Sequence, residues 1–168
     1  PGHSYNPLFL HGAVGLGKTH LLHAMGHTFE ADGLTVLYVT SEQFTNEFIT
    51  ALRHHSTDSF RGRYRSLDVL LIDDVNFMGG KEQTLETFFH TFNSLHTNGS
   101  QIILTCDTPP HSIAKLGDRL RSRFEWGLVT HMKPPNLETR KSILRAKVTA
   151  KEVVLSEEVL QLGHGHRR

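Results

Sequence analysis

The sequence predicts an α/β fold built on a mostly parallel β-sheet. Short apolar segments, each with the length of a buried strand, alternate along the chain with longer segments whose apolar residues recur at helical spacing. The chain has 168 residues, of which 38% are hydrophobic and 21% charged, and this is enough to bury the core of one domain. We therefore expect one sheet covered by crossover helices.

Five strands are expected, because five short apolar segments are bounded by turn or helix-start residues. The single cysteine, Cys106, is interpreted as a small apolar residue of the fourth strand. The expected strands are Leu8 to His11, Thr35 to Thr40, Asp68 to Asp73, Gln101 to Cys106 and Leu128 to Met132.

Helices are expected between these strands. The first runs from Lys18 to Ala31 and stops before Gly33, and the second opens at Thr40 or Ser41, where Thr40 and Gln43 have capping-box spacing. A third runs from Lys81 to His96. Two apolar stripes are expected. The second helix carries Phe44, Phe48, Ile49 and Leu52, and the third carries Leu85, Phe88, Phe89, Phe92 and Leu95. Packing against the core is the favoured interpretation of the aromatic stripe on the third helix, and a groove for a partner is the alternative.

A proline pair, Pro134-Pro135, marks the expected end of the main domain, residues 1–135. Asn136 can cap a helix that begins at about Leu137. Residues 136–168 are too few for a core of their own, so we interpret them as the start of a helical lid that is truncated and has a disordered end.

The strongest chemical signal is a glycine-rich loop, Gly12-Ala-Val-Gly-Leu-Gly-Lys-Thr19, placed between the first strand and the first helix. It satisfies the pattern G-x-x-x-x-G-K-[ST]. Glycines let successive backbone N–H groups face a phosphate, and the helix N-terminus adds positive potential. We expect Lys18 to reach the β- and γ-phosphates of a nucleotide and Thr19 to offer its hydroxyl to Mg²⁺.

Two acids, Asp73 and Asp74, end the apolar strand Val69-Leu-Leu-Ile. Adjacent carboxylates repel each other, so a buried strand seldom ends in two of them without a cation. We expect Asp73 to hold Mg²⁺, directly or through water, and Asp74 to orient or activate the attacking water. Aspartate at the second position is one methylene shorter than glutamate, which favours slow hydrolysis. A purely structural role for the pair at the loop start is the alternative.

Asp107 follows the fourth strand and precedes Pro109-Pro110. Ligands of parallel sheets bind at the carboxyl ends of the strands, so Asp107 is a candidate to face the γ-phosphate and its water. The alternative is an Asx turn before the prolines.

Three arginines occupy five positions in Asp118-Arg-Leu-Arg-Ser-Arg-Phe124. On a helix Arg119 and Arg123 share one face, whereas Arg121 points elsewhere. Side-by-side arginines repel unless an anion is present, and the γ-phosphate on a neighbouring subunit would be one. An ordinary solvated helix is the alternative.

Taken together, these segments resemble the AAA+ domain of the bacterial replication initiator DnaA. The resemblance covers about Tyr5 to Val148 and implies a P-loop AAA+ fold with strand order 5-1-4-3-2, ATP or ADP bound with Mg²⁺ between protomers, and a filament on origin DNA that opens the duplex. The segments that carry it, in chain order, are Asn6-Pro-Leu-Phe-Leu, Gly15-Leu-Gly-Lys-Thr-His-Leu-Leu-His-Ala, Val39-Thr-Ser-Glu, Leu70-Leu-Ile-Asp-Asp, Phe88-Phe-His-Thr-Phe-Asn, Asp118-Arg-Leu-Arg-Ser-Arg-Phe and Pro134-Pro-Asn-Leu-Glu-Thr-Arg.

The resemblance also implies individual roles. Arg123 matches the arginine finger, Arg119 supports the subunit contact, and Asp107 takes the sensor-1 place. Ile49 and Lys81 match positions that line a channel for single-stranded origin DNA, although the family's basic residue near Lys81 is here Gln83. Nucleotide contacts are implied for Gly12, Ala13, Val14, Gly15, Leu16, Gly17, Lys18, Thr19 and His20.

The sequence also departs from the family pattern. A segment before Pro1 that helps enclose adenine, the sensor-2 arginine of the lid, and the helix-turn-helix that reads duplex origin boxes are not present, and we expect a fragment. Two alternatives to an initiator ATPase stay open: a catalytically silent regulatory module related to DnaA, and a helicase loader with the same fold.

Composition restricts the remaining possibilities. No secretory signal or membrane-length apolar stretch is evident, so we expect a cytoplasmic protein. The formal charge of +1 means that any nucleic-acid binding depends on local patches. His20, His23 and His27 fall near one face of the first helix, but no acid or cysteine joins them in register, and we interpret them as surface imidazoles.

Overall fold

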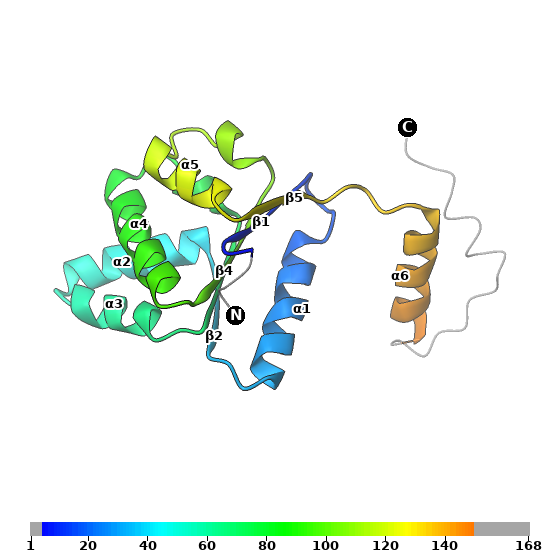
Figure 1. The fold of residues 1–168 in the computed structure, drawn as a ribbon, viewed down its shortest axis with the longest axis horizontal. Helices are drawn as coiled ribbons and strands as arrows, with labels where there is room; N and C mark the ends of the chain where they lie inside the picture. The colour runs from blue at the N-terminus through cyan, green and yellow to red at the C-terminus, as the bar shows by residue number, and fades with distance from the viewer. Residues whose placement is uncertain (1–4, 150–168) are drawn as a thin grey trace. The chain divides into compact units, whose positions relative to one another are not determined.

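The structure, a computed structural model, describes residues 5–149 (Figure 1). The chain divides into two units, Pro1–Met132 and Lys133–Arg168. The first unit holds the sheet, and the described part of the second holds one helix, α6 (Leu137–Thr149). As expected, Asn136 caps α6, since its side-chain oxygen accepts a hydrogen bond from the backbone N–H of Thr139 at 2.9 Å. The predicted disordered end lies outside the described residues.

The first unit is built on a five-stranded, fully parallel sheet of order β2-β3-β4-β1-β5, which confirms the predicted order. Thr35 and Asp68 precede their strands rather than open them: the Thr35 N–H donates to the Asp68 carboxylate at 2.8 Å, and the Thr35 carbonyl accepts from the N–H groups of Asp68 and Val69 at 3.0 and 3.1 Å. The strands are β1 (Leu8–His11), β2 (Val36–Thr40), β3 (Val69–Asp73), β4 (Gln101–Cys106) and β5 (Leu128–His131).

Helices cover both faces of the sheet, with α1 on one face and α2 to α5 on the other (Figure 1). The helix α3 has no counterpart among the predicted elements, and the two short 3₁₀ turns flank the carboxyl ends of β3 and β4. The bounds are α1 (Lys18–Ala31), α2 (Ser41–Arg53), α3 (Thr57–Arg65), α4 (Glu82–Thr97) and α5 (Asp118–Glu125), with 3₁₀ turns at Val75–Met78 and Pro110–Ser112.

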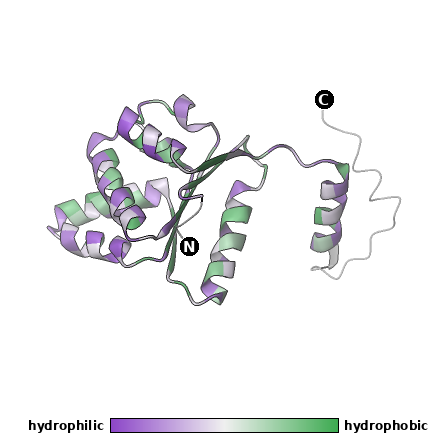
Figure 2. Cartoon of the chain, viewed as in Figure 1, coloured by the Kyte–Doolittle hydropathy of each residue, from purple (hydrophilic) through white to green (hydrophobic). Residues whose placement is uncertain are grey.

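Alternate residues of the strands belong to two hydrophobic clusters, one on each face of the sheet. Leu70 and Ile72 of β3 face the side of α2 to α5, whereas Val69 and Leu71 face α1. In Figure 2 the strands are accordingly hydrophobic along their length, while the helices carry polar outer faces. The larger cluster is rich in aromatic rings that meet edge to face or tilted: Phe44, Phe60, Tyr64, Phe88, Phe92 and Phe124.

The second helix begins as predicted. The Thr40 hydroxyl accepts from the Gln43 N–H at 3.1 Å, and the Gln43 side chain accepts from the Thr40 N–H at 2.9 Å, which completes the capping box. Its apolar stripe is less buried than predicted. Phe44 and Phe48 are buried, but Ile49 and Leu52 are 38% and 40% exposed, because Phe44, Phe48 and Ala51 already fill the contact with the core.

The stripe on α4 also differs from the prediction at its outer edge. Phe88, Phe92 and Leu95 are fully buried, whereas Leu85 and Phe89 are only partly buried. These two pack against the edge of the core on the side of α4 that faces α5, where they line a surface cavity.

Replacing Phe88 with alanine tests the importance of the aromatic cluster for stability. Phe88 is fully buried and its ring contacts Phe44, Phe92 and Phe124, so we expect Phe88→Ala to lower the free energy of unfolding by about 3–5 kcal/mol in urea titration. The matched control is Phe77→Ala, at a phenylalanine that is 59% exposed, where the change should stay within about 0.5 kcal/mol. Equal losses in the two variants would contradict this account of the core.

Candidate functional site

The loop between β1 and α1 depends on its glycines. Gly15 and Gly17 have φ angles of 83° and 93°, the left-handed region that other residues rarely adopt. A Cβ on Gly12 would lie 2.5 Å from the carbonyl oxygen of Met132, so no side chain fits there. The backbone can therefore curl around the N-terminus of α1, where unpaired N–H groups gather.

Lys18 lies at the centre of this loop with only 9% of its surface exposed. Its ammonium donates to the Asp107 carboxylate at 2.7 Å and to the carbonyl oxygens of Gly12 and Ala13 at 2.7 and 3.1 Å. The structure thus brings Asp107, from the end of β4, directly to the loop. An anion entering the loop would find a positive charge that is already held in place.

Asp73 accepts hydrogen bonds from three hydroxyl groups. The Thr19 hydroxyl donates at 2.7 Å, the Tyr38 hydroxyl donates at 3.0 Å, and Thr105 donates to the other carboxylate oxygen. Burial, followed by the charge of Asp73, raises the pKa of Tyr38 to about 12, so the phenol stays protonated and remains a donor. Three donors keep the carboxylate oriented towards Thr19.

Asp74 has a different environment from its neighbour. Its φ angle of 56° is in the left-handed region, and its N–H donates to the Thr105 hydroxyl at 3.0 Å, so Thr105 links both acids. The Oδ1 atom of Asp74 is buried and has no hydrogen-bond partner in the described part of the chain. Burial, and then the charges of Asp107 and Asp73, raise the pKa of Asp74. This carboxyl is therefore a better proton acceptor than a solvated aspartate.

These groups surround a cavity of about 530 Å³ at the carboxyl edge of the sheet. The cavity brings together most of the residues assigned from the sequence to nucleotide, metal and hydrolysis, from three parts of the chain that lie far apart. The residues that line it are Val14, Gly15, Gly17, Lys18, Thr19, His20, His23, Asp73, Asp74 and Asp107.

The donor set fits a triphosphate carried with Mg²⁺. In residues 5–149 no group of three or more His, Cys, Asp or Glu is placed to hold a metal ion through protein ligands alone. Mg²⁺ is typically bound through one or two protein oxygens while phosphates and water complete its shell. The paired Thr19 hydroxyl and Asp73 carboxylate supply such a partial shell.

The two arginines assigned to a subunit contact lie apart from this cavity. Arg119 and Arg123 share one face of α5 and line a separate surface hollow of about 410 Å³, together with Phe89, Ser122 and Trp126. Arg121 points elsewhere, as the helical spacing predicts, and pairs with Asp118 at 2.7 Å. Neither Arg119 nor Arg123 is among the residues that line the loop cavity of its own chain.

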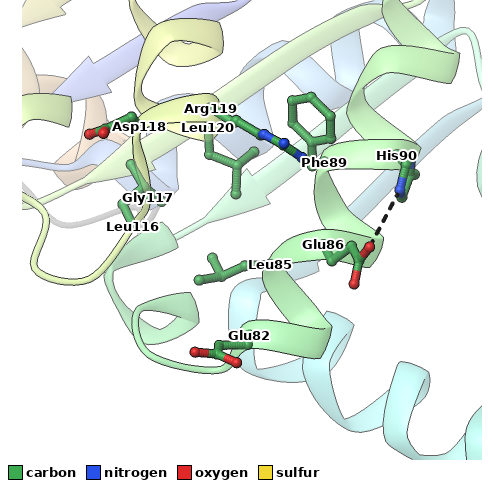
Figure 3. Close-up of a pocket in the computed structure, with 10 residues that line it drawn as sticks. All are labelled: Glu82, Leu85, Glu86, Phe89, His90, Leu116, Gly117, Asp118, Arg119 and Leu120. Carbon is green, nitrogen blue, oxygen red and sulfur yellow. Dashed lines mark ion pairs between the residues drawn. The ribbon is translucent and has the colours of Figure 1, made fainter.

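Arg119 also borders a second cavity, of about 530 Å³, between α4 and the start of α5 (Figure 3). Leu85 and Leu120 project into it, Phe89 lines it beside Arg119, and the carboxylates of Glu82, Glu86 and Asp118 lie around its edge (Figure 3). Sequence reasoning assigned no role to this cavity.

The residues assigned to DNA also lie outside the loop cavity. Ile49 is exposed on α2, and Lys81 is the exposed residue that precedes α4. Both side chains are accessible to a partner.

Sequence reasoning missed Tyr38, Thr105 and His23 as members of the site. The ring of His23 lies 4.1 Å from that of Tyr38, whose hydroxyl reaches Asp73 from β2. The pairing of Ile72 with Leu104 sets Asp73 beside Thr105, so strand register would have identified the threonine. The sequence alone does not give that register.

A family model described as the bacterial DnaA ATPase domain matches residues 1–131. The chain belongs to this family. Domain III of the DnaA replication initiation protein from Thermotoga maritima is 45% identical with a TM-score of 0.90, over 96% of this chain and 68% of that one. AMPPCP-bound DnaA from Aquifex aeolicus is 39% identical with a TM-score of 0.89, over 96% of this chain and 50% of that one.

A structure of the replication initiator DnaA bound to AMPPCP and single-stranded DNA is 39% identical with a TM-score of 0.88, over 96% of this chain and 50% of that one. This chain thus spans about half the length of two of these three structures. The DnaC helicase loader matches at 18% identity and a TM-score of 0.68, over 79% of this chain and 81% of that one, which shows a shared fold alone. Within residues 5–149, no helix is both long enough and apolar enough to cross a bilayer.

Replacing Asp74 with asparagine should separate stability from activity. Because the fold raises its pKa, Asp74 favours the folded state most when protonated, and this contribution is lost as pH rises through the folded pKa. At neutral pH we expect Asp74→Asn to melt at a higher temperature than the wild type, with an advantage that shrinks as pH falls towards 3.8. Hydrolysis of ATP should fall by about 10²- to 10⁴-fold, because a proton acceptor is lost.

Calorimetric melting and phosphate release measure the two effects. The control is Asp58→Asn, at a side chain that is 99% exposed, which should change neither. A lower melting temperature for Asp74→Asn at neutral pH, with activity retained, would show that Asp74 is a structural residue.

Proposed function

We propose that the chain is the ATP-binding, slowly hydrolysing AAA+ module of a bacterial replication initiator, which assembles on origin DNA in its ATP state and promotes opening of the duplex. The observation that carries the proposal is the convergence of Lys18, the Thr19–Asp73 pair and Asp74 on one cavity at the sheet edge. Membership of the DnaA ATPase family supports it.

Binding of the nucleotide would depend on the glycine loop and Lys18. The N–H groups of the loop and of the first turn of α1 would donate to the phosphates of ATP or ADP. Lys18 would exchange its bond to Asp107, and those to the loop carbonyls, for bonds to phosphate oxygens. Thr19 and Asp73 would hold Mg²⁺, which would neutralise part of the negative charge of the phosphates.

Hydrolysis would depend on the acids behind the phosphates. The unpartnered Oδ1 of Asp74, with its raised pKa, would accept the proton of the attacking water. Asp107, freed from Lys18, would help to place that water at the end of the phosphate chain. The short aspartate favours slow turnover, which suits a switch that returns to its ADP state after one round of assembly.

Assembly would use the arginine face of α5. Neither Arg119 nor Arg123 pairs with a carboxylate within residues 5–149, and both face the hollow on α5 rather than their own nucleotide cavity. Their charge is therefore available to a triphosphate carried by a second copy, where an arginine supplied in trans accelerates hydrolysis by about 10³- to 10⁵-fold in related P-loop enzymes. In this way ATP would link neighbouring protomers.

The proposed DNA partner is single-stranded origin DNA. The initiator structure with bound AMPPCP and single-stranded DNA supports this class of partner. Exposed Lys81 would bind a phosphate electrostatically, and Ile49, 38% exposed on α2, would contact a base or sugar. Replication regulators or a helicase are further partners of such a module, and its place of action would be the cytoplasm.

The variant Lys18→Ala tests nucleotide binding. We expect the dissociation constant for MgATP to rise by about 10- to 100-fold, because bonds to a charged group are worth roughly 1.5–3 kcal/mol. Isothermal titration calorimetry measures it, and Lys115→Ala, at an exposed lysine outside the loop cavity, is the control that should bind like the wild type. Equal affinities in all three proteins would remove the basis of the proposal.

The variant Arg123→Ala tests assembly. It should bind MgATP with unchanged affinity but lose ATP-dependent sedimentation with single-stranded DNA, whereas Arg121→Ala, which removes the same charge from the same helix, should assemble like the wild type. Wild-type sedimentation that is the same with ATP and ADP would instead favour a silent module.

A further inference from the structure

Arg123 is held by aromatic rings instead of an acid. Its guanidinium carbon lies 4.5 Å from the ring centroid of Trp126 and 5.9 Å from that of Phe89. Within residues 5–149 it forms no ion pair with a carboxylate, whereas Arg121, two residues earlier, bonds Asp118 at 2.7 Å. On the same helix, Arg121 thus has a carboxylate as its partner, whereas Arg123 has aromatic rings.

The indole that holds Arg123 is itself fixed from the core. Trp126 is 60% exposed, yet its ring is stacked on His96, with centroids 5.0 Å apart and planes 13° apart. His96 is stacked in turn on Phe92, at 6.2 Å and 11°. Phe92 is fully buried and contacts Phe124 of α5. A ladder of rings therefore runs from the hydrophobic core through α4 to an exposed tryptophan.

Packing against an aromatic ring differs from a salt bridge in its effect on the guanidinium group of Arg123. A carboxylate partner would neutralise the charge and occupy the N–H donors that a phosphate needs. A ring face attracts the cation but leaves its N–H groups at the edge free to donate. An arginine on a ring is thus restricted in position while its hydrogen bonds remain available, which lowers the entropy cost of meeting an anion.

We propose that Trp126, fixed by His96 and Phe92, is a positioning residue that holds Arg123 ready for the terminal phosphate of a nucleotide on a second copy of the chain. This inference rests on the proposed function. The hollow that Trp126 shares with Arg119, Ser122 and Arg123 is where that phosphate would enter. Trp126 contributes through Arg123 and touches no reacting atom itself.

Fluorescence tests the contact without nucleotide or DNA. Trp126 is the single tryptophan of the chain, so all indole emission reports on this ladder. Arg123→Ala should shift the emission maximum and make the indole more accessible to acrylamide, because the guanidinium no longer covers one face. Arg121→Ala, which removes a charge that pairs with Asp118, should leave both quantities at their wild-type values. Identical spectra and quenching in Arg123→Ala and the wild type would overturn the contact.

Assembly on single-stranded DNA tests the role. In Trp126→Ala the ATP concentration needed for half-maximal assembly should rise by about 2- to 30-fold, the range expected from a lost cation–π interaction. Calorimetric affinity for MgATP should stay unchanged, and Trp126→Phe should restore most of the assembly because a ring is present again.

The outcomes separate the two proposals. Wild-type-like assembly by Trp126→Ala, or assembly by Trp126→Phe that is no better than that by Trp126→Ala, would refute the role of Trp126 while the proposed function stands. A wild-type chain whose assembly ignores ATP would refute the proposed function, and with it any role for Trp126 in that function. Fluorescence would then still decide whether the Arg123–Trp126 contact exists.

Discussion

The carboxyl edge of the sheet holds more acidic than basic side chains in its cavity, and this imbalance of charge determines what the site can bind. Among the residues that line the loop cavity, the Lys18 ammonium faces three carboxylates, Asp73, Asp74 and Asp107. Hydroxyl donors offset part of this excess at Asp73, whereas Asp74 keeps an unpartnered buried oxygen and a raised pKa. A divalent cation bound together with phosphates would reduce the repulsion among these carboxylates. The excess of acidic groups, which destabilises the empty site, would therefore favour binding of a nucleotide with its metal ion.

The fold determines why these charges meet. In the order β2-β3-β4-β1-β5, the strand β4 lies between β1 and β3, so the glycine loop after β1, the acids that end β3 and Asp107 after β4 come from three adjacent strands. Because these strands are parallel and largely buried, their ends are held by a rigid core rather than by loops. Precise placement of a few polar groups thus follows from the packing of many apolar ones.

Much of this arrangement could be predicted from the sequence, because its signals are local. The glycine loop, the capping box at Thr40 and the strand that ends in Asp73 each depend on neighbouring residues. Other features depend on register between distant segments: the bonds from Tyr38 and Thr105 to Asp73 follow from strand pairing. The helix α3 was missed because only Phe60 and Tyr64 of its nine residues are buried. Two apolar residues are too few to show a helical periodicity in the sequence. Asp107 had two open readings, and its contact with Lys18 became visible only in three dimensions.

Calorimetric titration of the unaltered chain shows whether this charge arrangement binds a triphosphate together with Mg²⁺. Three ligands are compared: ATP with Mg²⁺, ATP with the metal chelated, and adenosine. We expect saturable binding at one site, tightest for ATP with Mg²⁺, weaker without the metal and weakest for adenosine. Affinity that is indifferent to both the phosphates and the metal, or no binding of ATP at all, would contradict it.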